Sequence, residues 1–151
     1  MPKNMFYQNG LRFSCTRCSR CCREEPGYVF LSVTDVRKIL EKISIPYDYF
    51  LEVYCRWIPS SEGDRLSLRE KNNYDCIFWE KGGCALYEVR PFQCRSFPFW
   101  VSCLSSVEDW NRHAADCPGM NTGALHDCAE IDSWLAERRA QEFITRRTAP
   151  L

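Results

Sequence analysis

Four cysteines lie within eight residues near the start of the chain, with the spacing C-x2-C-x2-C-C. They are Cys15, Cys18, Cys21 and Cys22, and residues 15–22 are named the cysteine run. Apolar packing does not require such a density of one residue type, whereas two cysteines separated by two residues can turn both sulfurs toward one metal ion. The spacing is typical of structural zinc sites and of iron–sulfur ligation. The sequence therefore predicts thiolate metal binding, and the alternatives are a disulfide cluster or buried thiols.

The cysteine count and the absence of targeting signals indicate a reducing compartment. The chain has 151 residues and 11 cysteines, and an odd count would leave one thiol unpaired in a secreted protein. The first thirteen residues lack the apolar stretch of a secretory signal peptide. No segment approaches the roughly 20 apolar residues of a membrane span. We therefore expect a cytoplasmic protein without membrane association, in which cysteine clusters bind metals or carry redox chemistry.

The composition predicts one folded domain over residues 1–151 and indicates no electrostatic attraction to nucleic acid. The chain is 45% hydrophobic and 14% aromatic, which excludes disorder as the default state. Its 20 basic and 20 acidic residues cancel, so no net positive charge attracts phosphates.

Hydrophobic periodicity predicts a small, helix-dominated α+β domain whose N-terminal region is irregular. Residues 1–27 carry little periodic apolar pattern, so we expect loop and turns that metal staples together. Ser32 and Asp35 fit a capping box in front of a helix ending near residue 43. Asp127 and Glu130 fit a second box in front of a helix over 127–146. The remaining expected elements are a short strand over 28–31, a helix over 46–57, a weak strand over 66–68, a short hairpin over 76–87, an irregular stretch over 90–100 and a helix over 107–115.

Seven further cysteines follow the cysteine run, and some have informative surroundings. Cys76 and Cys84 bracket the turn Lys81-Gly82-Gly83, so a hairpin would bring their sulfurs toward each other. Cys94 lies inside the stretch R-P-F-Q-C-R-S-F-P-F, and a proline follows Cys117 directly.

Three stretches of the chain resemble the YkgJ-type CxxCxxCC cysteine-cluster family. They are the cysteine run, the Cys76…Cys84 pair, and the stretch R-P-x-x-C-R-x-x-P-F over residues 90–99. Phe13 and Cys117 also fit, so the resemblance covers about residues 13–119. It implies a zinc- or iron-chelating domain and leaves the metal and the biological task open.

Carried over residue by residue, the resemblance implies eight metal ligands, which suffice for two four-coordinate sites. Neighbouring residues such as Cys21 and Cys22 rarely direct both sulfurs to one tetrahedral ion, which favours two sites independently. Cys55, Cys103 and Cys128 match no ligand spacing, and we expect them to be packing thiols. The implied ligands are Cys15, Cys18, Cys21, Cys22, Cys76, Cys84, Cys94 and Cys117.

Zinc, at about two ions per chain, is the favoured metal, with iron or an iron–sulfur cluster as the alternative. Closed all-cysteine sites are typical of structural zinc. A C-x2-C-x2-C run with a remote Cys-Pro, here Cys117-Pro118, is also similar to bacterial ferredoxin ligation. Arg90 and Arg95 lie near Cys94 and are expected to offset the negative charge of metal-bound thiolates.

The most direct function is a metal-binding protein with a structural or metal-handling role. No nucleotide-binding, hydrolase or metalloprotease motif is present, and neither His113 nor His126 has a ligand spacing, so an enzyme is not favoured. An iron–sulfur redox protein is one alternative. Another is an accessory factor or enzyme linked to protein methylation, because flagellin-modifying lysine methylases carry a similar cysteine region. A third is an interaction module that binds an unidentified protein partner.

Overall fold

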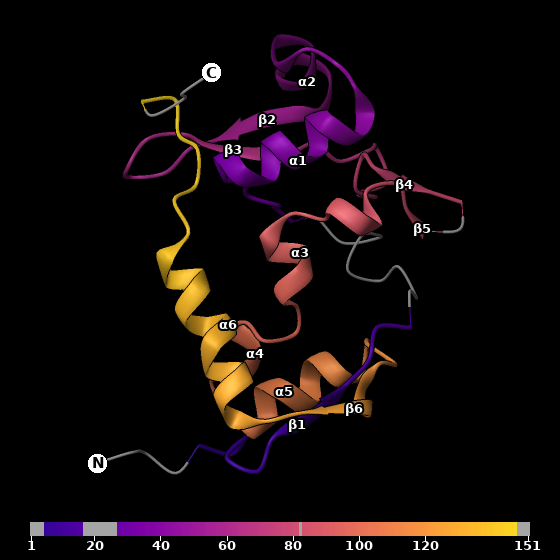
Figure 1. The fold of residues 1–151 in the computed structure, drawn as a ribbon, viewed down its shortest axis with the longest axis vertical. Coiled ribbons are helices and arrows are strands. Elements are labelled where there is room, and N and C mark those ends of the chain that lie inside the picture. Colours follow the sequence, from indigo (N-terminus) through magenta and orange to yellow (C-terminus); the bar gives the residue numbers. More distant parts are fainter. Residues whose placement is uncertain (1–4, 17–26, 82, 148–151) are drawn as a thin grey trace. The chain divides into compact units, whose positions relative to one another are not determined.

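The computed structural model describes residues 5–16, 27–81 and 83–147 (Figure 1). The chain forms two compact units, and each is built from two stretches of sequence. Unit 1 contains residues 1–20 and 96–140, and unit 2 contains residues 21–95 and 141–151. The described elements are helices and two-stranded antiparallel sheets, which confirms the predicted α+β class.

The first helix of unit 2 is α1 (Val33–Ile43), and its predicted capping box is confirmed. The Ser32 side chain accepts a hydrogen bond from the Asp35 amide, and the Asp35 carboxylate accepts one from the Ser32 amide. These two bonds satisfy amides that would otherwise have no partner at the first turn of the helix. The helix ends at Ser44, which adopts the left-handed conformation.

The second helix is shorter than predicted because its last turn is replaced by a strand. Helix α2 (Tyr47–Tyr54) ends three residues before Trp57, and β2 (Cys55–Ile58) follows directly. β2 pairs in antiparallel register with β3 (Arg65–Leu68), so that Trp57 lies opposite Leu66. β3 confirms the weak strand predicted over residues 66–68. Its partner β2 includes residues 55–57, which the apolar spacing had predicted to be the last turn of the preceding helix.

Residues 28–31 and the stretch after the last helix both bond to β3 at the edge opposite β2. The Leu31 amide donates to the Leu66 carbonyl, and the Leu31 carbonyl accepts from the Ile144 amide. The Leu66 amide in turn donates to the Ile144 carbonyl. The predicted strand over 28–31 is present only as an isolated bridge at Phe30.

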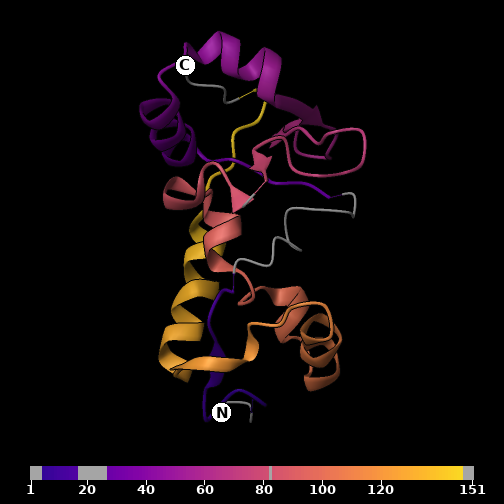
Figure 2. The same ribbon diagram turned by 90° about the vertical axis from the view of Figure 1, so that its right-hand side faces the viewer.

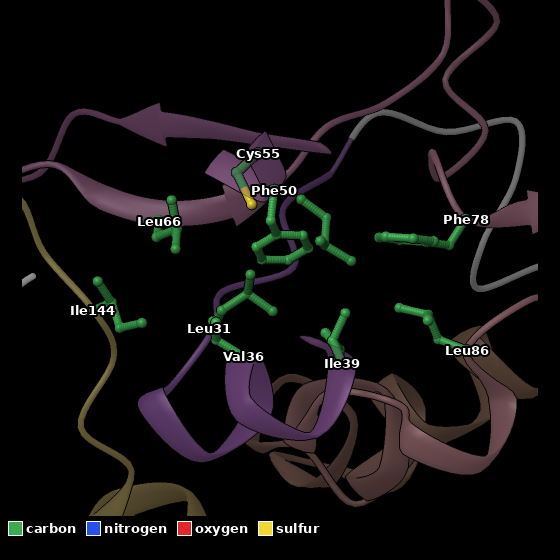
Figure 3. Close-up of a cluster of buried hydrophobic side chains, with 10 residues drawn as sticks. Leu31, Val36, Ile39, Phe50, Cys55, Leu66, Phe78, Leu86 and Ile144 are labelled. Carbon is green, nitrogen blue, oxygen red and sulfur yellow. The ribbon is translucent and has the colours of Figure 1, made fainter. Parts of the chain in front are cut away.

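The core of unit 2 collects buried side chains from α1, α2, β2, β3 and the final stretch of the chain (Figure 3). The Cys55 sulfur lies beside the Phe50 ring inside this core (Figure 3). The buried members are Leu31, Val36, Ile39, Phe50, Cys55, Leu66, Leu68, Phe78, Leu86 and Ile144.

The predicted hairpin is confirmed, and the predicted irregular stretch after it contains a short helix. Strand β4 (Trp79–Glu80) pairs with β5 (Gly83–Cys84), and the 3-10 helix η2 (Tyr87–Val89) follows. Helix α3 (Phe92–Ser96) then lies inside the range expected to be irregular. Pro91 explains the difference, because its carbonyl accepts hydrogen bonds from two residues of the helical turn, and proline suits a helix start.

Unit 1 is organised around a strand pair that the sequence did not predict. Strand β1 (Leu11–Phe13) pairs antiparallel with β6 (Met120–His126), so residues 11–13 are extended rather than irregular. Helices α4 (Val101–Leu104) and α5 (Val107–Ala114) precede β6, and α5 confirms the predicted helix over 107–115. Helix α6 (Cys128–Ala140) follows β6 directly (Figure 2). The buried core of unit 1 contains Tyr7, Phe99, Cys103, Leu104, Trp110, Met120 and Ile131.

The C-terminal helix begins as predicted but ends earlier. The Asp127 carboxylate accepts from the Glu130 amide, which confirms the cap. Glu130 does not complete the box, because its carboxylate contacts His126 Nδ1 instead. The helix stops at Ala140 rather than near residue 146, since Ile144 pairs with Leu31 and Leu66 in unit 2. Within the described residues, no helix is long and apolar enough to cross a bilayer.

Candidate metal centre

The structure describes five of the eight predicted ligands. Cys15 and Cys117 belong to unit 1, and Cys76, Cys84 and Cys94 belong to unit 2. Cys15 is exposed and the other four are half-buried. The remaining predicted ligands, Cys18, Cys21 and Cys22, lie outside the described residues.

The described cysteines do not by themselves assemble a complete site. Among residues 5–16, 27–81 and 83–147, no three His, Cys, Asp or Glu side chains lie close enough together to hold a metal ion. That thiolates of the cysteine run complete a four-coordinate site stays a prediction. The donor chemistry itself fits the metals in question, because cysteine sulfur suits both zinc and iron.

The entry to the cysteine run is fixed beside the segment that carries Cys117. The Ser14 amide donates to the Gly119 carbonyl over 3.1 Å, and the Ser14 hydroxyl accepts from the Ala124 amide over 2.9 Å. These bonds extend the β1–β6 pairing by one residue, to the position directly before Cys15. The backbones that carry Cys15 and Cys117 therefore run side by side in unit 1.

This close approach requires glycine at position 119. A Cβ atom placed on Gly119 would lie 2.2 Å from the Ser14 carbonyl oxygen. Real Cβ atoms essentially never approach so closely, and the obstacle is backbone rather than a flexible side chain. Glycine at position 119 is thus required for the close pairing with Ser14, the residue directly before the cysteine run.

Gly27, the first described residue after the cysteine run, is held by an ion pair in unit 2. The Glu70 carboxylate accepts from the Gly27 amide over 2.9 Å, and Arg56 Nη2 donates to the Gly27 carbonyl over 2.9 Å. Arg56 and Glu70 also pair with each other at 2.7 Å, and the Arg56 guanidinium lies 5.3 Å from the centre of the Tyr28 ring. Glu70 makes a backbone bridge to Cys76, so the same residue contacts Gly27 and a predicted ligand.

Cys94 lies in α3 after two residues that are anchored to other parts of unit 2. The buried Asp35 carboxylate accepts from the Phe92 amide over 3.0 Å. The Gln93 side-chain amide accepts from the Phe30 amide over 3.2 Å and donates to the Tyr28 carbonyl over 2.6 Å. The position of Cys94 therefore depends on contacts made by its two predecessors.

Cys84 ends the hairpin and accepts a backbone hydrogen bond on its sulfur. The Leu86 amide donates to Cys84 Sγ over 3.3 Å. A donor aimed at sulfur stabilises the thiolate form that a metal requires. Cys84 pairs across the hairpin with Trp79, while Cys76 precedes that strand by three residues. That the sulfurs of Cys76 and Cys84 meet on one metal ion stays a prediction.

The arginines beside Cys94 shape its loop. Arg90 Nε donates to the Tyr87 carbonyl over 2.9 Å, and its guanidinium lies 4.0 Å from the centre of the Tyr87 ring. Arg95 Nε donates to the Arg90 carbonyl over 3.2 Å and its guanidinium lies over the Phe92 ring. A contact between either guanidinium and a metal-bound thiolate stays a prediction.

Two of the three cysteines without a ligand spacing are buried, as expected of packing thiols. Burial raises the pKa of Cys55 to about 12 and that of Cys103 to about 11, so both hold their protons at neutral pH. Cys128 is only half-buried. Its thiol donates to the Asp132 carboxylate over 3.7 Å, and its pKa is raised by burial and by that carboxylate.

His126 also has structural partners. Its Nδ1 atom contacts the Glu130 carboxylate and its Nε2 atom lies 2.9 Å from the Phe13 carbonyl oxygen. Both ring nitrogens thus have partners within unit 1.

Sequence reasoning did not identify the residues that anchor the ligand segments. Gln93 stands directly before Cys94, and Gly119 follows Cys117 by two residues, which is the only local signal that either carries. Asp35 is recognisable as a helix cap, but its bond to Phe92 joins segments far apart in the sequence.

Comparisons with known proteins agree with the cysteine pattern. The model of the CxxCxxCC family, described as "Putative zinc- or iron-chelating domain", matches residues 14–118. The curated relative named Uncharacterized protein MJ0661, from Methanocaldococcus jannaschii, is 33% identical over 97 residues, which are 63% of this chain and 49% of that protein. The chain thus spans about half the length of this relative. No solved structure matches. Since the family model covers most of the chain and the whole set of predicted ligand cysteines, the chain belongs to the CxxCxxCC family of cysteine-cluster domains.

Proposed function

We propose that this protein binds about two zinc ions through cysteine thiolates and that the metal holds the cysteine run in place. The observation that carries the proposal is that hydrogen bonds hold Ser14 and Gly27, the described residues that flank the run, next to segments with other predicted ligands. Ser14 is bonded to Gly119, next to Cys117, and Gly27 is bonded to Glu70, which bridges to Cys76. The residue before the run and the first described residue after it are thus each bonded close in sequence to a predicted ligand.

The chemistry of the donors favours zinc in a structural role. Eight thiolates and no predicted histidine or carboxylate ligand correspond to two closed all-sulfur sites, which leave no open position for substrate. The Leu86 amide that donates to Cys84 Sγ supports a thiolate there. A reducing compartment keeps such thiols available for metal, so we propose a cytoplasmic location.

Metal content of the whole chain tests the proposal. The protein is purified without oxygen and examined by native mass spectrometry and elemental analysis. We expect about two zinc ions per folded chain. A folded, freshly prepared protein with no bound metal would refute the proposal. Iron together with inorganic sulfide and a brown colour would instead establish the iron–sulfur alternative.

Hydrogen exchange tests the structural role separately. Structural zinc contributes on the order of 10–16 kcal/mol in small peptide sites. Chelation should therefore expose the Ser14 and Gly27 amides, which are the bonded amides that flank the run, while amides of α6 keep their protection for longer. Unchanged protection of the Ser14 and Gly27 amides in metal-free protein would contradict the structural role and leave metal binding intact.

A further inference from the structure

We propose that Gln93 is a positioning residue that aligns Cys94 for metal binding by joining α3 to residues 28–30. The inference rests on the proposed metal binding and adds a residue that acts through a ligand rather than as one. Helix α3 has only five residues, and so short a helix is not stable by propensity alone. Its position must come from tertiary contacts.

The backbone of residues 28–30 offers its hydrogen-bonding groups to two sides. On one side, the Val29 amide donates to the Ser67 hydroxyl over 3.0 Å and the Val29 carbonyl accepts from the Leu68 amide. On the other side, the Phe30 amide and the Tyr28 carbonyl both bond to the Gln93 side chain. Gln93 thus takes the place that a neighbouring strand would occupy.

Only a carboxamide completes this pairing. Its oxygen accepts from an amide while its NH2 group donates to a carbonyl, and a carboxylate can do only the first of these. One side chain therefore ties two backbone groups of residues 28–30 to the residue directly before Cys94. The buried Asp35 carboxylate fixes the preceding residue, Phe92, so the start of α3 is held at two points.

The test compares Gln93→Ala with Ser67→Ala in the full chain. Ser67 is a matched control, because its hydroxyl bonds the same segment at Val29, from the side opposite to Gln93. Metal-free protein is titrated with Co²⁺, and Zn²⁺ affinity is measured by competition with a chelator. We expect Q93A to weaken Zn²⁺ binding by about 10-fold or more, as for other residues that orient a ligand, and to change the Co²⁺–thiolate absorption bands. S67A should leave affinity within about twofold and the bands unchanged.

Two further variants keep the proposal testable if Q93A folds poorly. Gln93→Glu retains the acceptor for the Phe30 amide and loses the donor to the Tyr28 carbonyl, so its Zn²⁺ affinity should lie between those of wild type and Q93A. In a Cys94→Ala background, Q93A should cause no additional loss of affinity, because the ligand through which Gln93 acts is absent.

The outcomes separate this inference from the proposed function. If wild-type protein binds neither Co²⁺ nor Zn²⁺, metal binding itself is refuted. If wild type binds both ions but Q93A behaves like S67A in affinity and spectrum, metal binding stands and the positioning role of Gln93 is refuted. An equal loss from Q93A with and without Cys94 would also refute it.

Discussion

Replacing Gly119 by alanine should destabilise unit 1 and weaken metal binding, because the new Cβ atom has no room. It would lie 2.2 Å from the Ser14 carbonyl oxygen and 3.1 Å from the Ser14 carbonyl carbon. The obstacle is main chain, so rotation of a side chain cannot relieve it. The two strands must move apart, and the hydrogen bond from the Ser14 amide to the Gly119 carbonyl is lost or stretched.

The expected cost follows from these two effects. Forcing extra volume into a packed contact costs about 1–3 kcal/mol, and a lost hydrogen bond adds about 1 kcal/mol. A total of about 3 kcal/mol corresponds to a fall in melting temperature of about 6–12 °C for a chain of this size. Separation of Ser14 from Gly119 also separates the backbones that carry Cys15 and Cys117, so the Zn²⁺ content should fall as well.

Gly27→Ala is the matched control, because a Cβ atom there meets nothing within 4 Å and the position has no positive φ. Thermal unfolding followed by circular dichroism, with and without metal, measures the difference between the two variants. Gly27→Ala should stay within about 0.5 kcal/mol of wild type. If Gly119→Ala unfolds at the wild-type temperature and keeps its metal, the close approach of Ser14 and Gly119 is not a feature of the folded protein.

Three further predictions concern the cysteines and the α1 cap. Cys22→Ala and Cys94→Ala should each lower the metal-to-protein ratio measured by elemental analysis while Cys103→Ala should not, and equal losses in all three would overturn the division into ligands and packing thiols. Burial raises the pKa of Cys55 from 9.0 to about 12, so its contribution to stability is complete below pH 9 and is lost as the pH rises toward 12. Urea unfolding at several pH values should show a slope approaching about 1.4 kcal/mol per pH unit from this thiol, and a Cys55→Ala variant with the same slope would contradict this account. Asp35→Ala should cost about 2–3 kcal/mol in urea unfolding, since it removes the carboxylate half of the capping box and leaves the Ser32 and Phe92 amides without their acceptor, and a cost below about 0.5 kcal/mol would be incompatible with both bonds.

Features set by neighbouring residues could be predicted from the sequence. The α1 capping box needs only Ser32 and Asp35, three residues apart, and the hairpin turn needs only a few residues rich in glycine. The cysteine spacing is local in the same way, so the family resemblance follows from the order of the residues alone. The family match over residues 14–118 confirms that resemblance.

Features that depend on a distant partner could not be predicted. Residues 55–58 continue the apolar spacing of α2. They nevertheless form a strand, because all four of them pair with residues 65–68. Ile144 fits the apolar stripe of α6 equally well, but its backbone bonds to Leu31 and Leu66. The roles of Gln93 and Gly119 could not be predicted for the same reason. Gln93 contacts Tyr28 and Gly119 contacts Ser14, and each contact joins segments far apart in the sequence.

The discontinuity of the two units has a consequence for synthesis on the ribosome. Leu31 and Ile144 share a buried core and are joined by a backbone hydrogen bond, yet most of the chain is made between them. At about 5–20 residues per second, that interval lasts on the order of ten seconds. During that time neither unit has all its segments, since β1 waits for β6 and β3 waits for the stretch after α6. Ser14, directly before the cysteine run, emerges early and can form its hydrogen bonds to Gly119 and Ala124 only after these late residues have been made.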